Sequence, residues 1–276
     1  MQNKLIFITI DGLRFDTAVS QMGYINHLVE KGTAARYKVQ SELPSMSRPL
    51  YEVLLTGTPA YQNGITHNGV VRLSHEKSLF HLTKEQGRTN ATASYYWVSE
   101  LYSRAPFLPE RDRFQFEGTD AIEKGIFYWE DHYPDSHLFA DANYLLHTYK
   151  PDFLYIHSMN VDDDGHKFTS DSKQYRGRAI GTDIILAHAL PQWLKEGYQV
   201  IVTADHGMNT DGLHGGTTFE ERSVPLYIIS EKVKPQIVEE EIPQLQLAPL
   251  ACHLLNIQPS SAMQPLTIPG VVGASE

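Results

Sequence analysis

Short apolar runs recur along the chain and alternate with segments of helical periodicity. We expect buried strands at 4–10, 91–98, 152–158, 198–203 and 224–229. Near-continuous apolar character over four to eight residues is typical of strands covered on both faces, as in a parallel sheet. Helices are expected at roughly 22–31, 48–56, 135–149, 172–195 and 245–255. This alternation predicts an α/β fold with crossover connections.

The stretch from about 99 to 134 departs from this pattern. It is aromatic, charged and poorly periodic, and it contains Pro106, Pro109 and Pro134. We expect it to form an excursion above the sheet that could serve as a small cap on the substrate side. No linker divides the 276 residues, so we expect one domain over 1–276.

Composition and charge narrow the class of protein. Apolar residues make up 41% and charged residues 20% of the chain, as in globular proteins. A net charge of -10 argues against binding a nucleic-acid polymer, and the single Cys252 excludes a disulfide framework and a thiolate metal cluster. No apolar run approaches the ~18 residues of a spanning helix, and no secretory signal is evident. We therefore expect a cytoplasmic protein with no membrane part.

Acidic residues and histidines follow the predicted strands directly. Asp11 follows the first strand, Asp162 comes shortly after the third, and Asp205 with His206 follows the fourth. In such folds ligands bind beyond the carboxyl ends of the parallel strands. Adjacent Asp and His offer an oxygen and an imidazole nitrogen, both of which zinc accepts. The alternative for Asp205 and His206 is an ordinary polar loop.

Two further motifs supply the same ligand types. The spacing Asp162-x-x-Gly165-His166 lets a carboxylate and an imidazole converge, with Gly165 removing a side chain that would block their approach. His214 is flanked by glycine and follows His206 by eight residues, so its loop could return another imidazole to the site. A lone loop histidine is more often simply exposed.

Ser47 lies at the predicted start of the helix over 48–56. Backbone N–H groups at a helix start point outward and favour an anion. A metal ion bound to the serine oxygen would ease its deprotonation and make it a nucleophile without a histidine base. For a single serine, a helix N-cap is the commoner role.

These motifs together resemble the alkaline phosphatase superfamily, most nearly its type I phosphodiesterase/nucleotide pyrophosphatase branch. The matching segments stand in the family's order from residue 5 to about 255: Ile10-Asp11-Gly12, Pro44 to Gly57 with Ser47, Asp162-x-x-Gly165-His166, Ala204-Asp205-His206-Gly207-Met208 and His214-Gly215-Gly216. The resemblance implies an α/β three-layer sandwich with a mostly parallel central sheet.

The resemblance also implies two divalent metal ions, usually zinc, with manganese or iron as alternatives because nitrogen and oxygen ligands discriminate weakly among them. The expected ligands form two sets: Asp11, Ser47, Asp205 and His206 for one ion, and Asp162, His166 and His214 for the other. The serine would attack phosphorus and form a covalent phosphoryl-enzyme, which water activated by the second metal then resolves.

Asn68 matches the family asparagine that donates to a non-bridging phosphoryl oxygen, although Asn68-Gly69 is also typical of a tight turn. The family's nucleotide pyrophosphatases commonly have threonine followed by phenylalanine where this chain has Ser47 and Arg48. Ser-Arg-Pro at this place looks more like the phosphoethanolamine transferases of glycolipid anchor synthesis, which are membrane proteins. Arg48 could bind an anionic group of the substrate, or it could face solvent.

The resemblance implies a phosphohydrolase that cleaves a phosphodiester or pyrophosphate bond in a small-molecule substrate. A phosphomonoesterase or a phosphonate hydrolase could use the same site. Tyr51 stands where a sulfatase motif requires arginine, and the Gly-x-Ser-x-Gly motif of a serine esterase is absent. A catalytically silent metal-binding interaction module is a further alternative, weakened by Ser47 at the nucleophile position. The sequence does not specify the oligomeric state.

Overall fold

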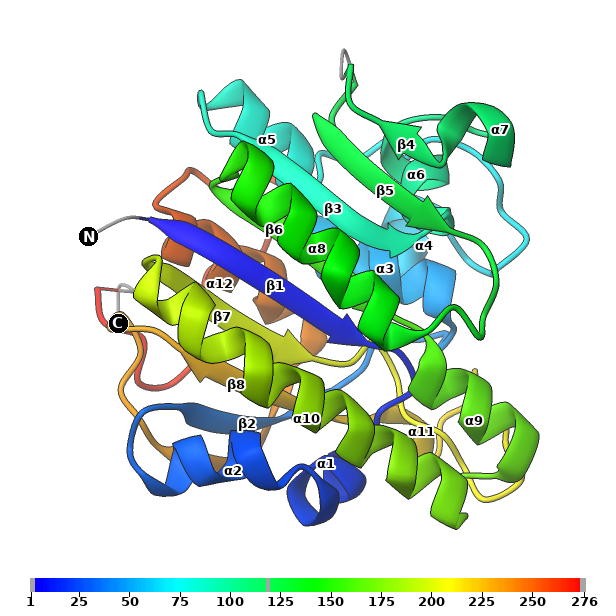
Figure 1. Ribbon diagram of the computed structural model, residues 1–276, viewed down its shortest axis with the longest axis vertical. Coiled ribbons are helices and arrows are strands. Elements are labelled where there is room, and N and C mark those ends of the chain that lie inside the picture. The colour runs from blue at the N-terminus through cyan, green and yellow to red at the C-terminus, as the bar shows by residue number, and fades with distance from the viewer. Residues whose placement is uncertain (1–2, 118–119, 274–276) are drawn as a thin grey trace.

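The protein is described by a computed structural model over residues 3–117 and 120–273 (Figure 1). The strands are β1 (Lys4–Ile10), β2 (Ala35–Gln40), β3 (Asn90–Tyr95), β4 (Phe114–Gln115), β5 (Lys124–Tyr128), β6 (Phe153–Ser158), β7 (Tyr198–Thr203), β8 (Ser223–Ile229) and β9 (Ile237–Pro243). The helices are α1 (Phe15–Gln21), α2 (Gly23–Glu30), α3 (Ser47–Thr56), α4 (Ala60–Asn63), α5 (Leu79–Glu85), α6 (Trp97–Tyr102), α7 (Pro109–Asp112), α8 (Asp135–Tyr149), α9 (Asn160–Phe168), α10 (Lys173–Lys195), α11 (Phe219–Arg222), the 3₁₀ helix η1 (Gln244–Gln246) and α12 (Leu247–Leu255).

The strands of the described residues form one sheet in the order β4-β5-β3-β6-β1-β7-β8-β2-β9. Neighbouring strands from β5 to β7 are parallel, whereas β4 and β8 run against their neighbours. The parallel run places the carboxyl ends of β6, β1 and β7 side by side. The α/β class and the mostly parallel sheet are confirmed.

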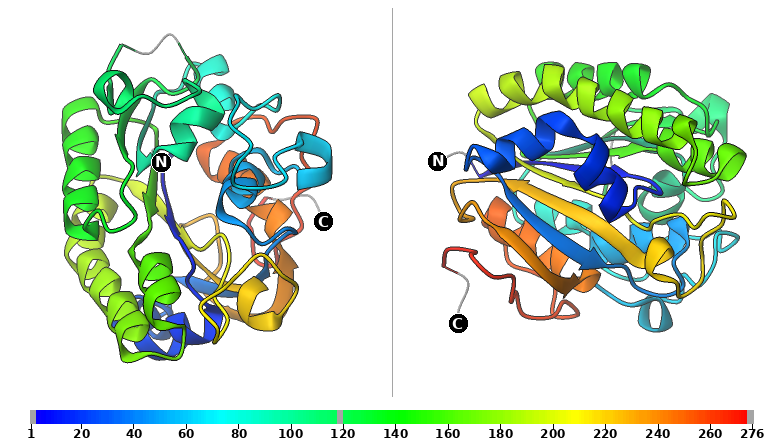
Figure 2. Two further views of the ribbon diagram at one scale, coloured as in Figure 1. Left: turned by 90° about the vertical axis from the view of Figure 1, so that its right-hand side faces the viewer. Right: turned by 90° about the horizontal axis from the view of Figure 1, so that it is seen from below.

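Helices cover both faces of this sheet and make three layers (Figure 2). The helices α8 and α10 pack on one face, against β3, β6 and β7. The helices α5 and α12 pack on the other face, and α3 lies beside α12. The inward side of α8 buries Leu138, Ala142, Leu145 and Leu146, the helical spacing that the sequence shows. Among the described residues, no helix is both long and apolar enough to cross a bilayer.

Several elements differ from the sequence-based expectation. The apolar run 224–229 is β8, but it pairs antiparallel with β7, because the connection over 204–222 holds only the four-residue helix α11 and no crossover helix on the sheet. The strand expected at 91–98 ends at Tyr95, and α6 begins at Trp97. The pattern did not predict β2, β5 or β9. The acidic residues 239–241 obscure β9, and charge of this kind is common on edge strands.

The segment 99–134 is not simply an excursion above the sheet. It contains β4 and β5, and β5 pairs parallel with β3, so this part of the segment extends the sheet at one edge. Residues 118–119 lie outside the described residues. The expectation of a cap on the substrate side therefore applies to the parts of 99–134 outside β4 and β5, and there it stays a prediction.

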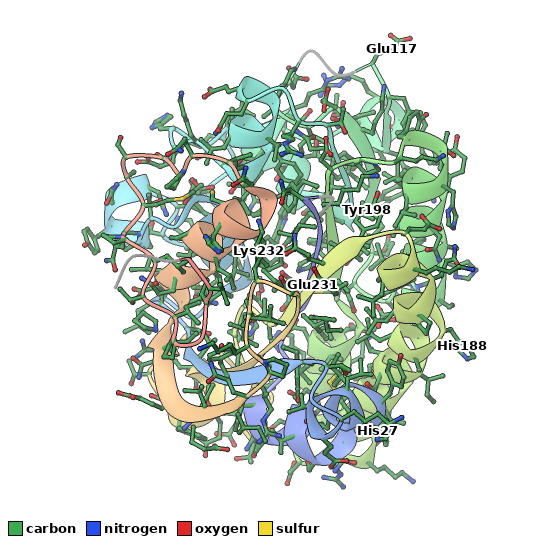
Figure 3. All side chains as sticks on the ribbon, turned by 90° about the vertical axis from the view of Figure 1, so that its left-hand side faces the viewer. His27, Glu117, His188, Tyr198, Glu231 and Lys232 are labelled. Atoms are coloured by element: carbon green, nitrogen blue, oxygen red, sulfur yellow. The ribbon has the colours of Figure 1, made fainter. Side chains whose placement is uncertain are left out.

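A cavity of about 590 Å³ lies at the opposite end of the sheet, near the start of β7. Tyr198 and Lys232 line it, and both lie on the face shown in Figure 3. The Nζ atom of Lys232 donates to the backbone oxygens of His253 and Leu254, so this cation stabilises the carboxyl end of α12. The cavity is remote from the strand ends that carry the predicted ligands.

Candidate active site

The carboxyl end of β1 leads directly into the site. The backbone N–H of Asp11 donates to the backbone oxygen of Ser158 at the end of β6, over 2.9 Å. Gly12 then turns the chain with φ of 71°. A Cβ atom on Gly12 would lie 2.9 Å from the Cα, Cβ and Oδ1 atoms of Asp162, so glycine is needed both for the turn and for this close approach.

Asp162 and His166 lie one turn apart on α9. Their spacing of four residues places both side chains on one helix face, where His166 Nε2 is 3.3 Å from Asp162 Oδ2. Gly165 has a different role from the one expected. A Cβ atom there would lie 2.8 Å from the Cε atom of Met208, so Gly165 makes room for the loop after β7 rather than for the convergence of the two ligands.

Three histidines meet in this region, each with its Nδ1 atom against a backbone carbonyl. His166 bonds to Gly212 over 2.8 Å, His206 to Gly207 over 2.9 Å and His214 to Ser45 over 2.9 Å. A carbonyl oxygen can only accept, so each Nδ1 carries the proton. In the neutral ring, Nε2 is then a lone-pair donor, the tautomer that metal-binding histidines adopt. The Nε2 atoms of His166 and His214 lie 3.2 Å apart.

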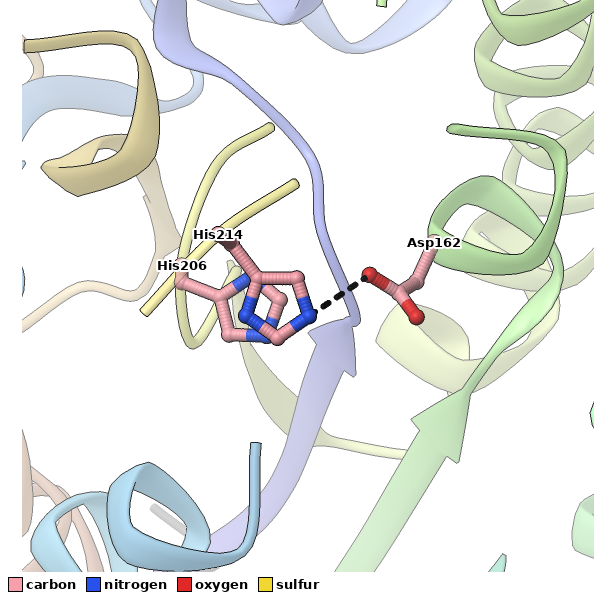
Figure 4. A group of neighbouring side chains, drawn as sticks. All are labelled: Asp162, His206 and His214. Carbon is pink, nitrogen blue, oxygen red and sulfur yellow. Dashed lines mark ion pairs between the residues drawn. The ribbon is translucent and has the colours of Figure 1, made fainter. Parts of the chain in front are cut away.

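Three buried carboxylates face these rings with an oxygen that has no hydrogen-bond partner. These atoms are Oδ1 of Asp11, Oδ1 of Asp162 and Oδ2 of Asp205. Nε2 of His206 lies 3.3 Å from the Asp11 oxygen and 3.4 Å from the Asp205 oxygen. Figure 4 shows the adjoining group, in which His214 Nε2 lies 3.7 Å from Asp162 Oδ1 and the rings of His206 and His214 stack.

Burial and the neighbouring charges shift the pKa values of the buried carboxyl groups in opposite directions. Burial, followed by repulsion from Asp11 and Asp162, raises the pKa of Asp205 well above its usual value. Burial would also raise the pKa of Asp11, but His206 and a hydrogen bond from His157 hold it below its usual range.

Among the histidines, burial and the nearby His206 lower the pKa of His214 to about 4. The contact with Asp162 raises the pKa of His166 to about 9. Crowded buried carboxylates beside an imidazole with a low pKa, such as that of His214, are stabilised by cations.

The donor set fits divalent metal ions. Buried polar atoms normally have partners, so the three unpartnered carboxylate oxygens call for a positive group. Ligand atoms within 4.8 Å of one another form two groups, Asp11 with Asp205 and His206, and Asp162 with His206 and His214. The expected pair of sites is therefore close together, with His206 positioned between them. His166, expected as a ligand of the second ion, borders that group through Asp162 and His214.

Ser47 is the first residue of α3, and Met46 occupies the N-cap position. An N-cap role for Ser47 is therefore excluded. Its Oγ atom lies 3.0 Å from Nε2 of His206, within the ligand cluster. The arrangement is not a serine–histidine–aspartate triad, because the Nδ1–H of His206 donates to the carbonyl of Gly207 and not to a carboxylate.

Asn68 and Arg48 lie beside the nucleophile position. The Oδ1 atom of Asn68 accepts the backbone N–H of Arg48 over 3.1 Å, so its amide nitrogen is left to donate elsewhere. Arg48 is 1% exposed, and its guanidinium donates to Glu100 over 2.6 Å. The guanidinium is thus paired inside the protein. It does not face solvent and is not free to bind a substrate anion, so it matches neither of the two expectations.

Two residues near Asp11 were missed by sequence reasoning. Tyr51 donates its hydroxyl hydrogen to Oδ2 of Asp11 over 2.5 Å, and Nε2 of His157 lies 3.1 Å from the same oxygen. Both side chains are fully buried. His157 had a recognisable signal, since it is a polar residue near the carboxyl end of an otherwise apolar predicted strand. Tyr51 had none, because one aromatic residue per helical turn is typical of a core.

Comparison with known proteins adds a family match. The model of the family described as type I phosphodiesterase/nucleotide pyrophosphatase matches residues 5–212. This range contains Asp11, Ser47, Asp162, His166 and His206 and stops just before His214.

Curated relatives match the chain at low identity. A GPI ethanolamine phosphate transferase 2 of Debaryomyces hansenii is 27% identical over 84% of this chain and 26% of its own length. The catalytic subunit of human GPI ethanolamine phosphate transferase 3 is 24% identical over 92% of this chain and 24% of its own length. The chain thus spans about a quarter of the length of these relatives.

The fold matches solved structures over nearly its whole length. Murine ectonucleotide pyrophosphatase/phosphodiesterase 5 superposes with a TM-score of 0.72, covering 96% of this chain and 97% of the murine one at 12% identity. The human protein of the same name gives a TM-score of 0.71, with 93% and 96% coverage at 14% identity. At such identities the similarity shows the shared fold.

Proposed function

Because the chain belongs to the type I phosphodiesterase/nucleotide pyrophosphatase family, we propose that it cleaves a phosphodiester or pyrophosphate bond through a covalent phosphoserine on Ser47. The observation that carries the proposal is the position of Ser47 Oγ, 3.0 Å from His206 Nε2 and inside a cluster of buried carboxylates with unpartnered oxygens. A hydroxyl at the first position of a helix, surrounded by such ligands, is suited to attack phosphorus.

Two divalent metal ions, most simply zinc, would be held by Asp11, Asp205 and His206 on one side and by Asp162, His166 and His214 on the other. When bound, such ions lower the energy of a serine alkoxide and neutralise the charge that develops on the phosphoryl group. The histidine Nδ1–H bonds to backbone carbonyls fix the rings so that their Nε2 lone pairs face inward.

In the first step, Ser47 Oγ loses its proton and forms a bond to phosphorus while the bond from phosphorus to the leaving-group oxygen breaks. The leaving group takes the bonding electron pair and a proton. Asn68 would donate its amide hydrogens to a non-bridging phosphoryl oxygen, because its carbonyl oxygen is already committed to the N–H of Arg48. A second displacement at phosphorus by water releases Ser47.

A diester suits this site better than a monoester. A dianionic monoester favours a positive side chain near the phosphoryl group. Arg48 is the residue next to the nucleophile, but Glu100 neutralises it and burial removes it from the substrate. An amide donor such as Asn68 stabilises a monoanionic diester without this charge.

Transfer to an alcohol is a second candidate for the same site. The curated relatives are GPI ethanolamine phosphate transferases by name. A phosphoserine intermediate can be resolved by an alcohol as well as by water, with the same bonds broken at Ser47. The reaction then differs only in the acceptor, which the described ligand cluster does not select.

The test is a substrate panel with metal analysis of the same sample. We expect bis-p-nitrophenyl phosphate to be cleaved with a higher kcat/KM than p-nitrophenyl phosphate, and Ser47→Ala to lower kcat by a factor of about 10³ or more. Intact mass spectrometry of the quenched reaction with bis-p-nitrophenyl phosphate should show a p-nitrophenyl phosphoryl adduct on Ser47, because the diester keeps its second ester group. Adding glycerol to the reaction and measuring phosphoglyceryl products distinguishes transfer from hydrolysis.

Ser20→Ala is the matched control, because Ser20 is an exposed serine on α1 that bonds only to nearby backbone and side-chain groups. It should retain wild-type turnover. Normal turnover by Ser47→Ala would exclude the covalent mechanism, and a preference for the monoester would exclude the diester assignment.

A further inference from the structure

We propose that Arg48 is a positioning residue that, together with Glu100, holds Asn68 in place beside Ser47. The proposal rests on the function proposed above, in which Asn68 donates to the phosphoryl group. It assigns Arg48 a role inside the protein, where the sequence suggested contact with the substrate.

Arg48 contacts the loop of Asn68 at two points. Its backbone N–H donates to Oδ1 of Asn68 over 3.1 Å, and its Nη1 atom donates to the backbone oxygen of Val70 over 3.0 Å. The backbone N–H belongs to the first turn of α3, where N–H groups have no partner within the helix. Residues on both sides of Gly69 are therefore bound to the residue that follows the nucleophile.

Glu100 holds the guanidinium from the other side. Its Oε2 atom accepts Nη2 of Arg48 over 2.6 Å, and its Oε1 atom accepts the backbone N–H of Phe107 over 2.9 Å. The indole ring of Trp97 lies 4.7 Å from the guanidinium carbon. Because Arg48 and Glu100 are both at least 95% buried, solvent screens this pair little.

The loop between α4 and α5 depends on such contacts. Residues 64–78 contain no helix or strand, and most of them are exposed or half-buried. A second buried carboxylate, Glu52 on α3, accepts the hydroxyl of Ser74 further along the same loop. The two sets of hydrogen bonds hold different parts of the loop. Arg48 binds Asn68 and Val70, whereas Glu52 binds a residue six positions after Asn68.

This arrangement matters for the reaction because a donor stabilises a developing charge only if it is already oriented. Arginine is suited to this positioning role, since the two terminal nitrogens of its planar guanidinium can bind the Val70 carbonyl and the Glu100 carboxylate at once. Lysine has a single ammonium group and cannot reproduce this planar pair of donors.

The experiment removes the side-chain bonds of Arg48 to Val70 and Glu100 without leaving a buried charge, and it keeps the backbone N–H that Asn68 accepts. Replacing both partners in R48M/E100M exchanges the ion pair for apolar side chains, whereas either single substitution would leave an unpaired charge inside the protein. We expect N68A to lower kcat/KM for bis-p-nitrophenyl phosphate by about 10²-fold. We expect R48M/E100M to lower it at least about tenfold, and to lower it less than about twofold further in the N68A background.

If the fold losses in kcat/KM of R48M/E100M and of N68A multiply in the combined variant R48M/E100M/N68A, the ion pair and Asn68 act independently. That result would overturn the proposal. Wild-type kcat/KM in R48M/E100M would also overturn it. If N68A has no effect while Ser47→Ala is inactive, the proposed reaction stands and the positioning role is rejected. Metal content should equal that of the wild type in every variant.

A readout without turnover separates this proposal from the proposed function. Hydrogen exchange of the amides in 64–72 should rise at least about tenfold in R48M/E100M. The control is R36M/E239M, which removes an ion pair between β2 and β9, away from Ser47. Exchange in 64–72 should be unchanged there. Unchanged exchange in R48M/E100M would overturn the positioning role even if the protein cleaves no phosphodiester.

Discussion

Nε2 of His157 lies 3.1 Å from Oδ2 of Asp11, and neither side chain is exposed to solvent. Tyr51 donates to the same oxygen, so Oδ2 is occupied by two hydrogen bonds while Oδ1 has no hydrogen-bond partner. The carboxylate is therefore fixed in one orientation, with Oδ1 turned toward His206. Removing a group that orients a metal ligand in this way typically lowers metal affinity or activity by about 10- to 100-fold.

Tyr51→Phe should weaken divalent metal binding by about 10- to 100-fold, because Asp11 loses one of the two hydrogen bonds that orient it. Affinity is measured by competition with a chromogenic chelator, so the result does not depend on turnover. Tyr155→Phe is the control, since the Tyr155 hydroxyl is also buried but bonds to Thr9. Equal affinity in the two variants would mean that Tyr51 has no orienting role.

Asp205→Asn should affect the metal-free and metal-loaded protein in opposite directions. Burial and the neighbouring carboxylates raise the pKa of Asp205, so its ionised form destabilises the folded state when no cation is present. In excess chelator we expect a higher melting temperature than that of the wild type. With added zinc the wild type should gain stability and the variant should gain much less. Similar stabilisation of both proteins by zinc would argue against Asp205 as a ligand.

Gly12→Ala should destabilise the protein and weaken metal binding. The left-handed conformation alone costs about 1–2 kcal/mol with a side chain, and a Cβ atom would lie 2.9 Å from Asp162. Gly32→Ala is a matched control, because Gly32 has a similar φ of 68° and nothing within 4 Å of the new carbon. Chemical denaturation should show a larger loss for Gly12→Ala. Equal losses would mean that Asp162 moves aside without penalty.

Glu52→Gln should flatten the dependence of stability on pH. Burial raises the pKa of Glu52 from 4.5 to about 7, although hydrogen bonds from Ser74 and Tyr102 act in the opposite direction. The folded state therefore holds its proton more tightly than the unfolded state, and stability falls as pH rises through this range. Between pH 5.5 and 8 the wild type should lose about 2 kcal/mol relative to the variant.

The measurement is urea denaturation of both proteins at each pH, with the difference between them plotted. Arg72 and Glu76 are the other charged groups that act on Glu52, and both remain in the variant. Contributions from the metal ligands cancel in the difference because these are common to the two proteins. A difference that stays constant with pH would show that Glu52 does not titrate in this range.

The sequence predicted the parts of the site that depend on local pattern. Apolar runs located β1, β6 and β7, and parallel strands bring their carboxyl ends to one edge, so polar side chains placed directly after them had to meet. Asp11, Asp162, Asp205 and His206 were found in this way. The spacing of Asp162 and His166 also has a local cause, because both lie on one face of α9.

What the sequence alone determined is the α/β class and the carboxylate and imidazole side chains that gather after the strands, because both follow from the order of residues along short segments. Only the tertiary structure decided which distant groups become partners. The register of β6 against β1 brings His157 beside Asp11, and the packing of α6 on α3 brings Glu100 to Arg48 across 52 residues. Such pairings depend on how whole elements pack, and no local pattern records them.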